Sequence, residues 1–147
     1  MQTFHFRLDA LLKFRRMQEE EAQIKLAQST AAFLREKERL DSFQQNLSLH
    51  LDTIRNQQKQ PVTVATLKML HDYHDKIKKD IVGQQLLVTE AATRRREDLA
   101  VLEQAIKAHK LVKKLREKRF LQYQTEMLHE EQKSLDELGL QVFARQK

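Results

Sequence analysis

Pro61 is the only proline of this 147-residue chain, and the long segments on either side of it hold just two glycines, Gly83 and Gly139. Proline and glycine are the residues that helix interiors tolerate least. A third of the residues are charged. This composition is typical of long helices or a coiled coil, whose buried surface is a thin seam rather than a compact core.

The residues around Pro61 are predicted to form a turn between two helices. Proline removes a backbone donor and disfavours helical conformation at the residue before it. Thr63 is a suitable N-cap for the helix that follows. We therefore expect a helix over about residues 5–56, a turn over 57–63 and a second helix over about 64–143.

Apolar residues repeat at heptad spacing through the first predicted helix. One series is apolar at all positions but one: Leu12, Glu19, Leu26, Phe33, Leu40, Leu47 and Ile54. The interleaved series is mixed: Leu8, Arg15, Ala22, Ser29, Glu36, Phe43 and His50. An average spacing of 3.5 residues indicates a left-handed coiled coil, and the mixed series indicates an imperfect seam.

These patterns predict an all-α fold, a long antiparallel two-helix coiled coil that forms a single domain over residues 1–147. The second helix is longer and extends beyond the end of the first. The seam of the second helix has one irregularity, because the steps from Ile77 to Ile81 and from Ile81 to Gln85 both span four residues. This irregularity predicts local unwinding or a bend near residues 78–86.

Basic residues are concentrated at one end of the predicted hairpin. Residues 107–119, hereafter the basic band, contain seven Lys or Arg and one Glu. In a hairpin that turns near residue 61, contacting residues have numbers that sum to about 122, so the basic band lies opposite residues 3–15. Basic residues also occur there: Arg7, Lys13, Arg15 and the adjacent Arg16. Like charges that face each other destabilise a coiled coil, so this arrangement suggests that the basic residues bind a partner.

No sequence motif for catalysis is recognisable. There is no Gly-rich phosphate loop, Cys/His metal cluster or nucleophile elbow. His71 and His74 have a spacing that could hold a metal, but no third ligand is evident. Cysteine is absent, which excludes disulfides and thiolate sites. We expect no enzyme activity, no cofactor and no bound metal, because a thin two-helix rod also lacks a concave pocket.

The chain has no apolar run long enough for a signal peptide or a membrane span, so we expect a cytoplasmic protein. Its formal charge of +6 favours an acidic partner without identifying it. Four interpretations of the exposed groups remain open. They are nucleic-acid contact through the basic stripe, membrane-surface contact through the segment FHFRLDALLKFRR, self-association of the C-terminal part of the second helix, and a merely solvated charged face.

Both ends of the chain resemble one protein family. The N-terminal residues that carry the resemblance are Phe4, Phe6, Leu8, Leu11, Leu12, Arg15, Glu19 to Glu21, Ala22 and Leu26. They form the pattern Phe-x-Phe-x-Leu, Leu-Leu, Arg and a Glu run, which resembles the opening of FliJ proteins, stalks of the flagellar export apparatus. The C-terminal sequence YQTEMLHEEQKSLDELGLQVFAR is similar to the ending of that family. The resemblance covers essentially the whole chain.

The resemblance implies a soluble antiparallel coiled coil of the bacterial cytoplasm, peripheral at the export apparatus of the inner membrane. It implies three kinds of partner: the hexameric export ATPase FliI, the cytoplasmic part of the export gate protein FlhA, and export chaperones. The implied roles are promotion of ATPase assembly and activity, linkage to the gate, and escort of unloaded chaperones. The alternatives are the equivalent stalk of a virulence-type secretion system, and a coiled-coil scaffold without an ATPase partner.

The resemblance also suggests which residues bind each partner. The residues predicted to contact the ATPase pore are Arg15, Arg16, Lys107, Lys110, Lys113, Lys114, Arg116, Lys118, Arg119, Phe120 and Tyr123. The residues predicted to contact the export gate are Leu40, Phe43, Leu47, Tyr73 and Ile77. Asp80 and Gln84 stand where the family can have a small apolar residue and a histidine.

Overall fold

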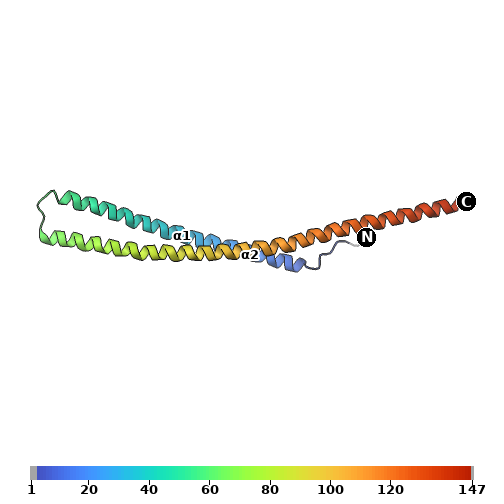
Figure 1. Ribbon diagram of the computed structural model, residues 1–147, viewed down its shortest axis with the longest axis horizontal. Coiled ribbons are helices and arrows are strands. Elements are labelled where there is room, and N and C mark those ends of the chain that lie inside the picture. The colour runs from blue at the N-terminus through green and yellow to red at the C-terminus, as the bar shows by residue number, and fades with distance from the viewer. Residues whose placement is uncertain (1–2, 147) are drawn as a thin grey trace. The chain divides into compact units, whose positions relative to one another are not determined.

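The computed structural model describes residues 3–146, which form two helices joined by a short connection (Figure 1). Helix α1 spans Asp9–Gln57 with 49 residues, and helix α2 spans Val64–Arg145 with 82 residues. They pack together as an antiparallel hairpin, and no strand occurs within residues 3–146. The predicted fold class is confirmed, including the greater length of α2.

Helix α1 begins about four residues later than predicted. Arg7 and Leu8 form a turn, and the amide of Leu12 donates to the carbonyl of Leu8 at 2.9 Å as the first helical bond. Asp9 opens the helix, where a carboxylate is favoured by the helix dipole, and its side chain is paired with Lys13 at 3.4 Å. The segment before it, residues 3–6, is not helical.

The connection between the helices follows the prediction closely. Residues 58–63 separate the two helices, and Thr63 caps α2. The amide of Thr66 donates to the hydroxyl of Thr63 at 3.4 Å, and the two hydroxyls lie 2.8 Å apart. The amide of Leu67 donates to the carbonyl of Thr63, as expected of an N-cap residue.

The unwinding predicted near residues 78–86 is absent, and α2 continues as an α-helix through Gly83. Gln84, rather than Gln85, occupies the seam and is 4% exposed. The seam therefore keeps its alternation of four- and three-residue steps through Ile77, Ile81, Gln84 and Val88. A glutamine is tolerated there because its Nε2 donates to both the backbone carbonyl of Glu36, at 2.9 Å, and the carboxylate of that residue.

Packing divides the chain into two units, which are described separately below. The turn unit comprises residues Glu21–Leu102. The terminal unit comprises the described residues up to Glu20 together with those from Glu103 onward. The organisation of residues 1–147 as a single domain stays a prediction.

In the turn unit, the mixed heptad series of α1 is the more deeply buried one. Ala22, Ser29 and His50 are almost inaccessible, whereas the more apolar series from Leu26 to Ile54 is only half-buried. Small side chains allow the two helices to approach closely. His50 is accommodated because its Nε2–H donates to the carbonyl of Leu70 at 3.0 Å. The small and polar side chains of the mixed series therefore occupy the most deeply buried positions of α1 in this unit.

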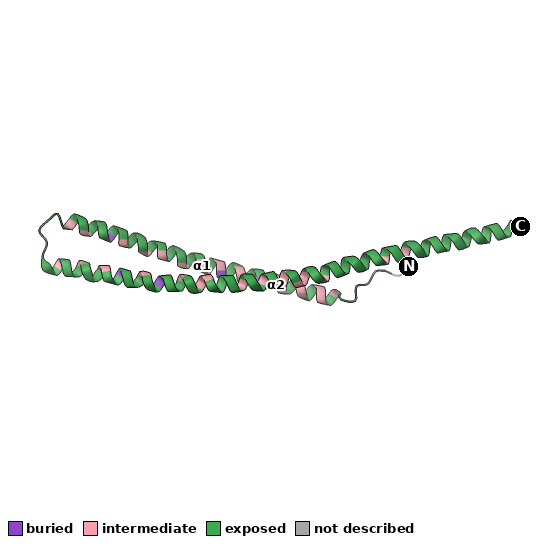
Figure 2. Cartoon of the chain, viewed as in Figure 1, coloured by how far each residue is buried: buried purple, intermediate pink, exposed green. Residues whose placement is uncertain are grey.

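Few side chains are buried in either unit. Phe6, Ala22 and Ile77 are the only buried apolar residues among those that the structure describes. The chain exposes 12553 Å², whereas a globular protein of 17.5 kDa exposes about 7,900 Å². Figure 2 shows that exposed residues dominate both helices and that the less exposed residues are interspersed along them. The predicted thin seam is confirmed.

Truncating Ile77 tests how much each seam contact contributes. We expect Ile77→Ala to lower the free energy of unfolding by about 2 kcal/mol, because it deletes methylene groups at one of the few buried apolar positions. The matched control is Val82→Ala on the exposed side of α2, with an expected loss below about 0.5 kcal/mol. Urea unfolding followed by circular dichroism measures both, and equal losses would contradict this description of the seam.

Candidate functional site

The residues predicted to contact the ATPase all lie in the terminal unit. Helix α1 supplies Arg15 and Arg16, and α2 supplies the basic band with Phe120 and Tyr123. Every lysine and arginine of the basic band is exposed. The helical pattern distributes these long side chains around α2, and Lys113 and Arg116 occupy the same heptad positions as Phe120 and His109.

The charge of the basic band is not neutralised within the protein. In the described part of the chain, no carboxylate lies within ion-pair distance of any of its lysines or arginines. The basic residues of α1 differ: Arg16 pairs with Glu20 at 3.2 Å, and Arg15 donates to the amide oxygen of Gln18 at 3.0 Å. The basic band therefore carries a net positive charge, which attracts acidic partners.

A polar contact joins the two helices within the terminal unit. The Nδ1–H of His109 donates to the Glu19 carboxylate at 2.6 Å, and both side chains are largely buried. In the turn unit, the guanidinium of Arg95 lies over the ring of Phe33, 5.5 Å from its centroid.

An aromatic cluster holds the N-terminal segment against α2. The Phe4 ring lies 5.2 Å from that of Phe120 and 5.5 Å from that of Tyr123, and Phe6 is buried. Phe120 and Tyr123, predicted to bind the ATPase, thus serve at least partly in internal packing. At Phe120 and Tyr123, α2 therefore packs against the non-helical segment 3–6 rather than against a second helix.

The same packing removes most of the amphipathic face that had suggested membrane contact. Phe4 and Phe6 face the protein, and Leu11 and Leu12 are half-buried. Phe14 is the one phenylalanine of that segment that is exposed, among the described residues. None of the helices in residues 3–146 combines the length and apolar character that a membrane span requires.

Beyond the aromatic cluster, α2 continues as a C-terminal extension, residues 124–146. All of its residues are exposed except the half-buried Met127. Its exposed apolar side chains include Leu128, Leu135, Leu138 and Val142. An extension of this kind was predicted, and its apolar content indicates a binding surface.

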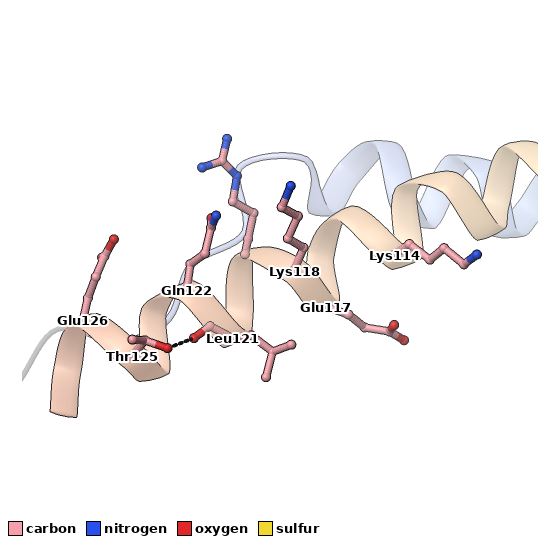
Figure 3. A pocket seen from close by; sticks show the side chains of 8 residues that line it. Lys114, Glu117, Lys118, Leu121, Gln122, Thr125 and Glu126 are labelled. Carbon is pink, nitrogen blue, oxygen red and sulfur yellow. Dashed lines mark hydrogen bonds between the residues drawn. The ribbon is translucent and has the colours of Figure 1, made fainter. Parts of the chain in front are cut away.

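The surface of the terminal unit is open rather than enclosed. A shallow hollow is lined by eight residues between Lys114 and Glu126, all of them on α2. Figure 3 shows side chains of this hollow, among them Glu117 and Leu121, extending outward from the helix. Such a surface suits contact with another macromolecule better than enclosure of a small substrate.

The predicted export-gate residues lie in the turn unit and are only partly accessible. Leu40, Phe43 and Leu47 are half-buried, and Ile77 is buried in the seam. Tyr73 is half exposed, with its ring centroid 4.7 Å from that of the buried His50. Tyr73 is therefore the member of this set best placed to contact a partner.

The described histidines lie in different surroundings. Residues 3–146 contain no group of three or more His, Asp or Glu side chains arranged to hold an ion. His71 is exposed, while His74 stacks on His50 at 6.1 Å. Sequence reasoning missed the role of His50 and Gln84 in the seam, although the heptad position of His50 was a signal for it.

Comparison with known proteins identifies one family. The model of the family described as FliJ, flagellar FliJ protein, matches residues 4–147. Searches of the curated proteins and of the solved structures found no significant match.

Loosening the N-terminal segment tests the aromatic cluster. We expect Phe6→Ala to expose residues 3–8 and to increase trypsin cleavage after Arg7 at least about fivefold, because a lost buried aromatic ring costs several kcal/mol. Phe14→Ala, at an exposed position, is the control and should leave the cleavage rate unchanged. Equal cleavage of the Phe6 variant and the wild type would show that the segment is not held by this packing.

Proposed function

Because the chain belongs to the FliJ family, we propose that it works as the stalk that engages and activates the hexameric ATPase of flagellar protein export. Family membership implies a stalk protein of flagellar or related type III export. The finer roles are part of the proposal: the chain binds the ATPase FliI, links it to the gate protein FlhA and escorts export chaperones at the inner-membrane apparatus.

The observation that carries the proposal is the exposed and unneutralised basic band of the terminal unit. Concentrating seven basic side chains in one short segment of a helix does not stabilise the fold, because like charges close together repel. The charge instead favours association with an acidic surface, and raises its rate. Acidic loops lining the pore of a ring-shaped ATPase are a partner of the required sign.

The family description also bears on the alternatives. It names a flagellar protein, which favours the flagellar stalk over its virulence-type equivalent. The family is one of non-catalytic stalk and escort proteins, in keeping with the open surface of the terminal unit. The scaffold without an ATPase partner explains neither the family match nor the unneutralised charge.

Charge reversal in the basic band tests the ATPase contact. We expect the combined substitutions Lys110→Glu, Lys113→Glu, Lys114→Glu and Lys118→Glu to lower stimulation of the purified export ATPase at least about tenfold. Each exposed ion pair contributes about 0.2–1 kcal/mol, and reversal converts attraction into repulsion at four positions. ATP hydrolysis is measured as a function of added stalk protein.

The control keeps the total charge change but moves it to the turn unit. It carries glutamate at four exposed lysines: Lys68, Lys76, Lys78 and Lys79. This variant should stimulate hydrolysis like the wild type. Full stimulation by the basic-band variant, or equal loss in both variants, would refute a specific role for the basic band.

Substitution of Tyr73 tests the proposed gate contact. We expect Tyr73→Ala to weaken binding to the cytoplasmic part of the gate protein about tenfold, because exposed aromatic residues often anchor protein interfaces. Met69→Ala, a neighbouring exposed apolar position, serves as the control. Calorimetric titration measures both affinities, and unchanged binding of the Tyr73 variant would exclude this residue from the interface.

A further inference from the structure

The C-terminal extension carries a second heptad seam that α1 does not use. Leu121, Gln124, Leu128, Glu131, Leu135, Leu138 and Val142 follow one another in steps of three and four residues. The five apolar members are each more than half exposed. A stripe with this spacing is the pattern by which one helix packs along another.

This stripe begins on a different side of α2 from the one that the N-terminal part of the chain contacts. Phe120, Tyr123 and His109 mark the side that Phe4 and α1 contact within the terminal unit. At 100° per residue, Leu121 and Lys114 point at least about 100° away from each of these three residues. A further helix can therefore lie along the stripe without displacing the existing contacts.

The charges along α2 indicate what the further helix is. The basic band at residues 107–119 is followed by an acidic band at residues 126–137, with five Asp or Glu and one Lys. One helix thus carries both a basic and an acidic block, with Leu121 between them. Two copies of this helix placed antiparallel bring each basic band onto the acidic band of the other copy, whereas parallel copies oppose like charges throughout.

The charge bands select one of the registers that the heptad seam allows. In an antiparallel coiled coil, the a positions of one helix face the d positions of the other. This places Leu121 level with Gln124 of the second copy, and Lys114 level with Glu131 of the second copy. In this register the centres of the opposite bands also coincide. Lys110 lies level with Leu135 of the second copy, where its aliphatic stem covers apolar surface while its ammonium group stays in water.

We propose that residues 107–138 form an antiparallel homodimer, in which the acidic band and the apolar stripe of one copy lie along the basic band of a second copy. The overlap is roughly 48 Å long, and within it leucines of the stripe pack on the aliphatic stems of Glu117, Lys110 and Lys107 of the second copy. The dimer covers the basic band, so it competes with any other acidic partner of that surface. It depends only on the geometry of the terminal unit and not on the proposed function.

The association of the purified full-length chain tests the dimer without any ATPase. Sedimentation equilibrium should show a dimer at low salt that weakens as salt increases, because ionic screening reduces attraction between the bands. Leu128→Glu should raise the dissociation constant at least about tenfold. Leu140→Glu is the control, since Leu140 is exposed on another side of the same extension, and should leave the dissociation constant unchanged.

Cysteine cross-linking tests the orientation, since the chain has no natural cysteine. Two differently tagged variants, Lys114→Cys and Glu131→Cys, should form a mixed disulfide when combined under oxidation. Each variant alone should not, because its two cysteines are about 25 Å apart in the antiparallel dimer.

Three results would overturn the proposal. The first is a monomer at all protein and salt concentrations. The second is an equal effect of the Leu128 and Leu140 substitutions. The third is a disulfide that forms within each single variant but not between the two. None of these results bears on ATPase stimulation, so the dimer and the proposed function fail separately.

Discussion

The structure depends on the packing of two helices that each bury only one narrow face. Such a seam cannot supply a large apolar core, and its most deeply buried positions include small residues such as Ala22 and Ser29. Polar contacts across the seam, from Gln84 to Glu36 and from His109 to Glu19, add geometric specificity. A polar group buried in a coiled coil stabilises one register over others, because shifted registers leave it without a partner.

The remaining faces of both helices are left for partners and solvent. In the terminal unit this exposed surface is basic along residues 107–119 and acidic along residues 126–137. In the turn unit it includes the half-exposed ring of Tyr73. The two proposed contacts, with an ATPase and with an export gate, thus draw on chemically different surfaces of one hairpin. The exposed apolar stripe of the C-terminal extension adds a third surface, which suits a second copy of the chain.

Helical periodicity, the single proline and the Thr63 cap were enough to predict the fold, because a coiled coil repeats one contact along its length. The errors arose where local chemistry overrides the repeat. Phe4 and Phe6 pack outside a helix, and Gln84 enters the seam because it finds two acceptors on Glu36. The burial of Ile77 agrees with its place in the heptad repeat, whereas the resemblance had assigned it to the export-gate contact. The basic band was visible in sequence, but its lack of ion pairs required the structure.

Amide hydrogen exchange of the full chain, with and without the hexameric export ATPase, tests the central claim most directly. Bound ATPase should slow exchange in residues 107–123 of α2 and in the facing part of α1, and should leave residues 58–63 at the turn unchanged. Slowed exchange confined to the turn unit, with the basic band unaffected, would contradict the account.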